Sequence, residues 1–158
     1  MWWVQNPVRA KQEVAAIEKL QIDHSWLSTA APRALPAFRL GFDFDITVSG
    51  ITYPFLLTYP ALFPAAPPQI TPRDGRRLSG HQYGDGGELC LEYRADNWDP
   101  AVTGAIMIES AHRLLAAEDP DAEHRAPAPS AHHTSTGQDL RGQTFRFLVT
   151  RSLLEHVG

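Results

Sequence analysis

Cysteine is almost absent from this sequence, which has only Cys90, so no disulfide can form within the chain. The fold therefore does not depend on an oxidising compartment. No apolar run approaches the roughly 20 residues that a membrane-spanning helix requires, and residues 1–5 lack the charged and then apolar layout of a signal peptide. Lysine and arginine are scattered and the net charge is −4, which gives no electrostatic basis for binding nucleic acid. We expect a cytoplasmic protein that binds neither nucleic acid nor a membrane.

The composition is otherwise that of an ordinary globular protein, with 43% hydrophobic and 20% charged residues. A chain of 158 residues buries about 70% of its unfolded surface. We expect a single domain over residues 1–158, with its core in residues 1–124, a flexible connector in residues 125–138 and a C-terminal element in residues 139–158, a short strand followed by a short helix. His132-His133 lies in the connector without further ligands at suitable spacing, so no metal site is expected.

Two stretches have the periodicity of amphipathic helices. Residues 8–21 repeat apolar side chains every three residues, with Asn6 as a capping residue and Pro7 suited to the first turn. The expected buried positions of this helix are Val14, Ile17 and Leu20, and its expected solvent-exposed positions are Arg9, Lys11, Glu13 and Lys19. A second helix is predicted over residues 103–117, between Trp98-Asp99-Pro100 and Pro120.

Residues 38–48 alternate between apolar and polar side chains, which predicts a strand with one buried face. The expected buried positions are Phe38, Leu40, Phe42, Phe44, Ile46 and Val48. Ser49-Gly50 predicts a turn and residues 51–59 predict the returning strand, so the sheet is antiparallel. The following predicted segments are a rigid proline-rich loop at 59–68, a short strand at 69–71, a glycine-rich loop at 73–87 and an extended segment at 88–93. This order predicts an α+β fold.

Residues 51–121 resemble the core of ubiquitin-conjugating enzymes. The matching segments are Phe63-Pro64-Ala65-Ala66-Pro67-Pro68 for the family's proline loop, Gly87-Glu88-Leu89-Cys90-Leu91-Glu92 for its cysteine element, and Trp98-Asp99-Pro100 at the family's spacing from the cysteine. The resemblance implies a ubiquitin-conjugating-enzyme-like (UBC-like) fold and no cofactor. It also implies that Cys90 takes a ubiquitin-like modifier from an activating enzyme as a thioester and passes it to an amine of a target protein. With its departures from the family's pattern, the chain resembles divergent bacterial members, which are often encoded within antiphage defence systems.

The sequence departs from the family at the group that would stabilise the oxyanion of the discharge step. The family's His-Pro-Asn element appears as His81-Gln82-Tyr83, so the asparagine linked to this role is missing. Tyr83, Gln82 and Asn97 are the alternatives for donating a hydrogen bond to the oxyanion. His81 matches the family histidine, for which we expect a structural role in the loop rather than direct proton transfer.

Acidic residues are the candidates for helping an attacking amine lose its proton. The family position for such a residue aligns near Ala122, which cannot act. The candidates are therefore Asp119 or Asp121, with Asp96 and Asp99 as further alternatives.

Partner contacts are also implied by the resemblance. Basic residues on the family's first helix meet the activating enzyme, and Arg9 and Lys11 stand on the matching helix here. Ala65 aligns with the phenylalanine that docks ligases, so we expect no conventional RING-type ligase as a partner.

The residues around Cys90 favour a carrier thiol over a hydrolase. The flanking carboxylates are Asp85, Glu88 and Glu92. They are unlike a core composition and they disfavour a thiolate. Two alternatives stay open: an inactive module of the same fold that binds a modifier or scaffolds a complex, and a cysteine hydrolase that pairs Cys90 with His81 or His112.

Overall fold

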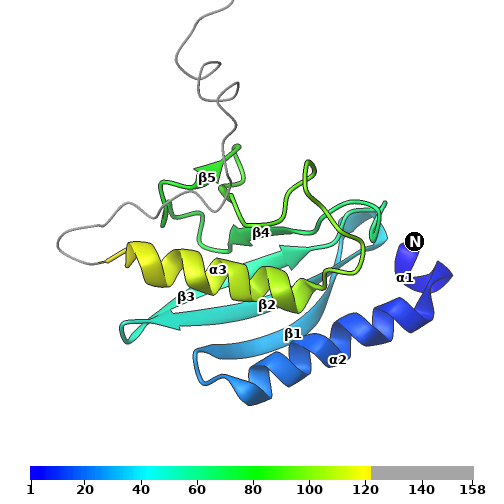
Figure 1. The fold of residues 1–158 in the computed structure, drawn as a ribbon, viewed down its shortest axis with the longest axis horizontal. Helices are drawn as coiled ribbons and strands as arrows, with labels where there is room; N and C mark the ends of the chain where they lie inside the picture. The colour runs from blue at the N-terminus through cyan, green and yellow to red at the C-terminus, as the bar shows by residue number, and fades with distance from the viewer. Residues whose placement is uncertain (122–158) are drawn as a thin grey trace, which may run out of the picture.

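The computed structural model describes residues 1–121, which form a mixed α+β fold with a helix at the N-terminus, a four-stranded antiparallel sheet and a central helix (Figure 1). In chain order the elements are α1 (Trp2–Gln5), α2 (Pro7–Asp23), β1 (Leu27–Leu35), β2 (Arg39–Val48), β3 (Ile51–Thr58), β4 (Gln69–Pro72), β5 (Gln82–Tyr83), β6 (Glu88–Leu89) and α3 (Gly104–Glu118). Every helix in this range falls short of the length and apolarity needed to cross a bilayer. The predicted connector at 125–138 and C-terminal element at 139–158 lie outside the described residues, as does the predicted end of the core at 124.

The main sheet is a meander in which successive strands pair antiparallel, in the order β1-β2-β3-β4. The predicted hairpin is confirmed, because β2 and β3 pair up to Val48 and Ile51, which flank the turn. Gly50 in this turn has a φ of 81°, a left-handed conformation that glycine adopts without a steric cost. The strand predicted at 69–71 is confirmed as β4.

β1 has no counterpart among the predicted elements. Leu27 is its only fully buried residue, so the segment lacks the apolar alternation that indicates a half-buried strand. β1 lies at the edge of the sheet, where its backbone pairs with β2 from Leu27 opposite Ile46 to Leu35 opposite Arg39. Backbone pairing therefore defines this strand, and side-chain periodicity does not.

Phe38 is a correction to the predicted buried face of residues 38–48. It lies in a short 3-10 turn, Pro36–Phe38, and 75% of its surface is exposed. Ala37 and Phe38 both have positive φ values, 58° and 54°, which breaks the two-residue period of the strand. The alternation is confirmed from Phe42 to Val48, where each predicted apolar residue is buried.

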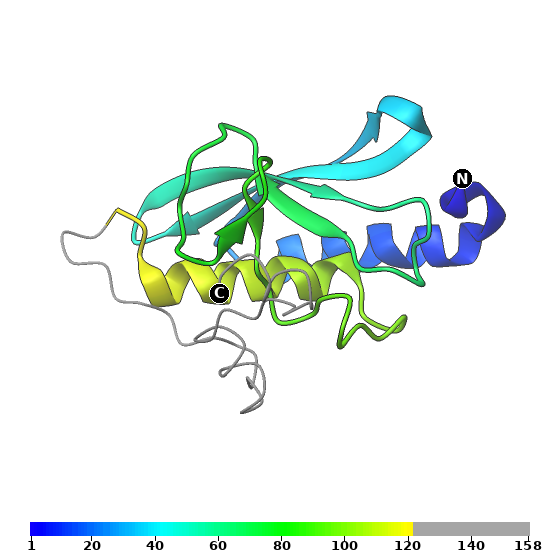
Figure 2. The ribbon, with the colours of Figure 1, turned by 90° about the horizontal axis from the view of Figure 1, so that it is seen from above.

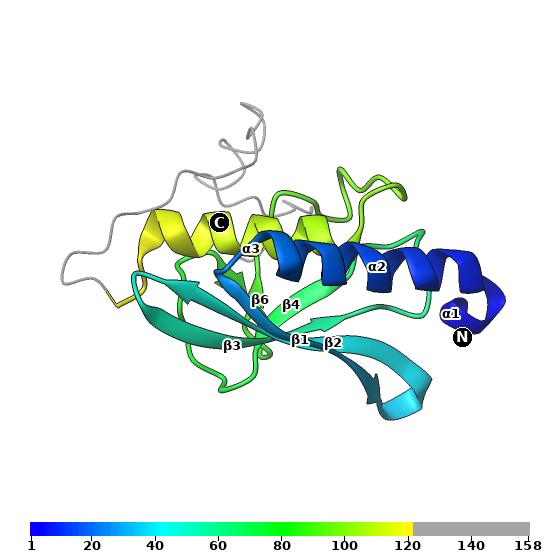
Figure 3. The ribbon, with the colours of Figure 1, turned by 90° about the horizontal axis from the view of Figure 1, so that it is seen from below.

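Both predicted helices are confirmed, as α2 and α3, and they lie on the same side of the sheet (Figures 2 and 3). Side chains at the positions preceding each helix cap it: Asn6 Oδ1 accepts from the Arg9 N–H at 3.1 Å, and Thr103 Oγ1 accepts from the Ile106 N–H at 3.4 Å. The largest fully buried side chains of the core include Tyr53, Tyr59, Phe42, Phe44 and Phe55.

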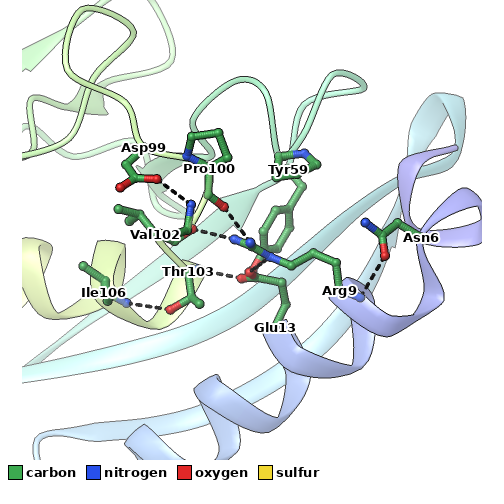
Figure 4. A network of polar contacts seen from close by, with 12 residues as sticks. Asn6, Arg9, Glu13, Tyr59, Asp99, Pro100, Val102, Thr103 and Ile106 are labelled. Atoms are coloured by element: carbon green, nitrogen blue, oxygen red, sulfur yellow. Dashed lines mark hydrogen bonds and ion pairs between the residues drawn. The ribbon is translucent and has the colours of Figure 1, made fainter.

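The prediction that Arg9 and Glu13 face solvent is wrong. Glu13 is completely buried, and its two carboxylate oxygens accept from Arg9 Nε at 2.7 Å, Tyr59 Oη at 2.6 Å and the Gly104 N–H at 2.6 Å (Figure 4). Arg9 also donates to the carbonyls of Pro100 and Val102, both at 2.6 Å. A charge tolerates burial when it is paired and fully hydrogen-bonded. The network ties α2 to the loop before α3.

Candidate functional site at Cys90

Cys90 follows β6 directly and its side chain is half-buried. Its backbone N–H donates to the His81 carbonyl at 2.6 Å, which holds the cysteine segment against the preceding loop. Its neighbours Leu89 and Leu91 are both buried, with 4% and 3% exposed. Because these leucines anchor the segment in the core, the thiol between them is held in place while it keeps partial exposure.

Gln82 closes the glycine-rich loop that precedes Cys90. Its side-chain oxygen accepts from the N–H groups of Leu78 at 2.5 Å and Ser79 at 2.9 Å, and its nitrogen donates to the carbonyls of Arg76 at 3.3 Å and Gly87 at 2.8 Å. Both amide hydrogens are therefore used by the loop backbone. The structure gives Gln82 a structural place, although it was one of the three candidates for the oxyanion donor.

Asn97 has a similar place in the turn that follows Cys90. Its side-chain oxygen accepts from the Arg94 N–H at 2.7 Å, and its side-chain nitrogen donates to the Glu92 carbonyl at 2.7 Å. The backbone N–H of Asn97 also donates to the Arg94 carbonyl at 3.1 Å. This candidate oxyanion donor thus closes the turn that carries Arg94.

Arg94 is the site residue that the sequence reasoning missed. Its Nη1 donates to Cys90 Sγ at 3.6 Å, and its Nη2 lies 3.4 Å from Asp96 Oδ2. The expected acidic setting of the thiol is corrected here, because the charged group in contact with the sulfur is a cation. Glu92, one of the flanking carboxylates, instead pairs with Arg113 at 2.6 Å. An arginine four residues after the cysteine is visible in the sequence, but the turn that brings it back to the sulfur is not.

Tyr83 is the third candidate oxyanion donor, and it pairs with Glu88 between β5 and β6, just before Cys90. Burial raises the pKa of its phenol, and the charges of Glu88 and Cys90 raise it further, while Arg94 acts in the opposite direction. The phenol therefore keeps its proton at neutral pH and remains a donor. Its side chain is 49% exposed.

A pocket of about 140 Å³ lies beside the cysteine segment. Its lining includes Tyr83, Leu89, Leu91, Tyr93, Arg94 and Pro68. Arg94, which contacts the Cys90 sulfur, and Tyr83 thus both line this pocket. A chain bound in the pocket would meet both a cation and a phenol O–H.

The backbone of His81 contacts both Cys90 and the loop before it. Besides accepting from Cys90 it donates its own N–H to Ser79 Oγ at 2.8 Å. Its imidazole Nε2 lies 3.9 Å from Glu118 Oε1, at the end of α3. The other candidate histidine, His112, stacks on Trp26 with ring centroids 4.0 Å apart.

The candidate acids Asp119 and Asp121 contact the β2–β3 hairpin. Asp119 Oδ2 accepts from the Ser49 hydroxyl at 3.0 Å, and Asp121 Oδ2 accepts from the Tyr53 hydroxyl at 2.7 Å. Burial, together with the hydrogen bond and charge of Asp121, raises the pKa of Tyr53 to about 12. Of the two further candidates, Asp96 lies near Arg94, whereas Asp99 accepts from the Ala101 N–H at 2.8 Å. Asp96 is thus the candidate acid joined to Cys90 through a shared neighbour.

The proline loop and the segment after the cysteine are joined by Trp98. Its indole N–H donates to the Pro64 carbonyl at 2.7 Å, and its ring lies 6.4 Å from that of Phe63. This agrees with a packing role for Trp98. Ala65 in the same loop is exposed.

The two predicted partner contacts on α2, Arg9 and Lys11, lie in different surroundings. Arg9 is engaged in the buried network and leaves only 13% of its side chain exposed, so it is not a free surface cation. Lys11 is exposed and lies at an apolar groove of about 300 Å³ that includes Trp3, Val14 and Leu40. Lys11 therefore remains the candidate for a partner contact.

No metal site emerges from the described part of the chain, where no three His, Cys, Asp or Glu side chains are grouped to hold an ion. His132-His133 lies outside that part. A scan against models of known protein families finds no match, and a search of curated proteins finds none either.

Proposed function

We propose that this chain is a UBC-like protein whose Cys90 carries a ubiquitin-like modifier as a thioester. The observation that supports this most directly is the setting of the thiol: a half-buried sulfur in contact with the Arg94 guanidinium, on a segment anchored by buried leucines and beside a narrow pocket. The order of helix, antiparallel meander, proline loop, cysteine segment and helix agrees with the family that the sequence resembles.

The proposed reaction consists of two acyl transfers. In the first, the Cys90 sulfur attacks the thioester of a charged activating enzyme, a new C–S bond forms and the enzyme's thiol leaves. In the second, an amine of the target attacks the Cys90 thioester, a C–N bond forms and Cys90 leaves. Both steps need a sulfur that a large partner can reach, which agrees with the partial exposure of Cys90.

The place of His112 favours an acyl carrier over a hydrolase that pairs Cys90 with His112. A hydrolase would require a histidine poised to take the thiol proton, whereas the His112 ring stacks on Trp26. An inactive module that only binds a modifier would not need a cation at the sulfur.

The cellular location, the biological role and the partners are part of the same proposal. A thiol that must remain free to accept an acyl group suits the reducing cytoplasm, and the resemblance to bacterial members suggests a role in antiphage defence. The exposed Ala65 offers no aromatic anchor to a RING-type ligase, so the proposed partners are an activating enzyme, the modifier and a target amine.

The test is a thioester assay with a matching activating enzyme, modifier and ATP. We expect an adduct on a non-reducing gel that disappears with reducing agent and is missing in Cys90→Ala. Cys90→Ser should give an adduct that resists reducing agent, because an oxygen ester replaces the thioester. If the activating enzyme is demonstrably charged and the wild-type chain still forms no adduct, the carrier function is wrong and a binding module remains. Release of modifier from a preformed conjugate without ATP would instead indicate a hydrolase.

A further inference from the structure

The proposed discharge step builds negative charge that no assigned residue yet stabilises. When the amine attacks the thioester, the carbonyl oxygen becomes an oxyanion and the sulfur then leaves as a thiolate. Gln82 uses both of its amide hydrogens in its own loop, and Asn97 closes the 92–97 turn. Of the remaining donors, Tyr83 and Arg94, Arg94 is the charged group in contact with the sulfur.

We propose that Arg94 is a catalytic residue, whose guanidinium stabilises both the thioester oxyanion and the departing Cys90 sulfur. This inference rests on the proposed function of Cys90. Arg94 Nη1 contacts the sulfur at 3.6 Å, so a carbonyl carbon bonded to that sulfur would place its oxygen close to the same guanidinium. Arg94 also lines the pocket beside the cysteine segment, together with Tyr83 and Leu89.

The hydrogen bonds of Arg94 do not use all of its N–H groups, so the side chain can also donate to such an oxygen. Within residues 1–121, its buried Nε has no acceptor within hydrogen-bond distance. In the same range its Nη2 pairs with the exposed Asp96, at 3.4 Å, and exposed pairs contribute little to stability. A planar guanidinium presents several N–H groups in one fork, so it can donate to sulfur and to an oxyanion together.

The turn from Arg94 to Asn97 fixes the position of this side chain. Asn97 accepts from the Arg94 N–H and donates to the Glu92 carbonyl, both at 2.7 Å. Asn97 is therefore a positioning residue, because it holds the backbone that carries Arg94. Asn97 therefore affects the discharge step through Arg94, whereas the sequence suggested that Asn97 itself donates to the oxyanion.

The discharge step needs no reactant other than the thioester, the amine and a solvent base. The amine lone pair forms the C–N bond, and the carbonyl π electrons move to the oxygen. When the carbonyl re-forms, the C–S bond breaks and its electron pair leaves with the Cys90 sulfur. The surplus amine proton passes to a solvent base. Arg94 keeps its own protons throughout, since a guanidinium does not lose its charge in proteins.

The test compares Arg94→Gln and Arg94→Lys with Arg113→Gln as the matched control. Arg113 is another arginine near the cysteine segment, and its side chain is 56% exposed and paired with Glu92. The first measurement is alkylation of the full chain by iodoacetamide at pH 7, without any partner. Because Cys90 is the single cysteine, the mass shift reports this residue alone. The second is single-turnover discharge of the preformed thioester to free lysine.

We expect Arg94→Gln to lower the alkylation rate several-fold and the discharge rate by about 100-fold, the typical loss of one oxyanion donor. Arg94→Lys should fall between wild type and Arg94→Gln, because it keeps the charge and loses the fork. Arg113→Gln should stay within about twofold of wild type, since solvent screens an exposed charge. Circular dichroism and thermal unfolding show whether each variant is folded.

The outcomes separate this inference from the proposed function. If the wild type loads and a folded Arg94→Gln discharges at the wild-type rate, Arg94 is not catalytic and Cys90 remains the carrier. If the wild type never loads from a charged activating enzyme, both proposals fall. Equal losses in Arg94→Gln and Arg113→Gln would show a general effect of net charge and would also overturn the role of Arg94.

Discussion

Gly104 is the first residue of α3, and its position leaves no room for a side chain. A Cβ there would lie 2.2 Å from Tyr59 Oη and 2.7 Å from Leu57 Cδ2. Both neighbours are fully buried, and the Tyr59 hydroxyl is held by Glu13 at 2.6 Å, so neither side chain is free to move aside. At the scale of one residue, the absence of a methyl group permits the close packing of α3 against Tyr59 and Leu57.

We expect Gly104→Ala to lower the free energy of unfolding by about 1–3 kcal/mol, the usual cost of overpacking. Urea denaturation followed by tryptophan fluorescence measures this. Gly86→Ala is the matched control, because the nearest atoms to a Cβ at Gly86 are 3.9 Å away. Equal stability of the Gly104→Ala variant and the wild type would contradict the close packing described for Tyr59.

At the scale of elements, α2 carries two ion pairs of the same spacing in opposite settings. Arg9 and Glu13 pair at 2.7 Å with 13% and 0% of their side chains exposed, whereas Lys19 and Asp23 pair at 2.5 Å with 76% and 45% exposed. The buried pair also binds Tyr59 and the first N–H of α3. It is therefore a connection between elements, while the exposed pair is local to α2.

We expect Glu13→Ala to destabilise the fold by about 3–5 kcal/mol, because it leaves a buried charge and buried donors without partners. Lys19→Ala should cost less than about 0.5 kcal/mol, as is usual for an exposed pair. Chemical denaturation measures both variants, and a double-mutant cycle of Arg9→Ala with Glu13→Ala measures their coupling. Similar losses in Glu13→Ala and Lys19→Ala, or a coupling energy near zero, would be inconsistent with the network in Figure 4.

At the scale of the whole molecule, we expect His112 to make stability depend on pH. Burial, with the nearby charges of His24 and Arg113, lowers the pKa of His112 below its usual 6.5. The unfolded chain therefore binds this proton more readily than the folded one, and acid favours unfolding. The contribution of His112 to stability is fully present above pH 6.5 and is lost as the pH falls below that value.

We expect the urea midpoint of the wild type to fall between pH 8 and pH 5 by more than that of His112→Phe. Phenylalanine removes the titrating group and keeps a ring to stack on Trp26, whose centroid lies 4.0 Å from that of His112. The difference between the two slopes isolates this residue from other groups that titrate in acid. Parallel curves would show that His112 does not contribute to the pH dependence.

Local sequence was sufficient for α2, α3 and the β2–β3 hairpin, because the apolar repeats and the residues that begin or end these elements lie within the elements themselves. It was not sufficient for β1, whose place depends on backbone pairing with β2. The same limit applied at Phe38, where two left-handed residues interrupt an otherwise regular alternation.

The sequence by itself singled out Cys90, since a lone cysteine after a glycine-rich loop, in a segment that resembles the family's cysteine element, is a local feature. Only the tertiary structure decided which charged side chains lie at Cys90 and which are buried in the core. Arg9 and Glu13 are buried because their partners come from residues 100–104, and Arg94 meets the sulfur because Asn97 closes a turn. The residue type at a position determines the chemistry of its side chain, but the path of the folded chain determines which groups that side chain contacts.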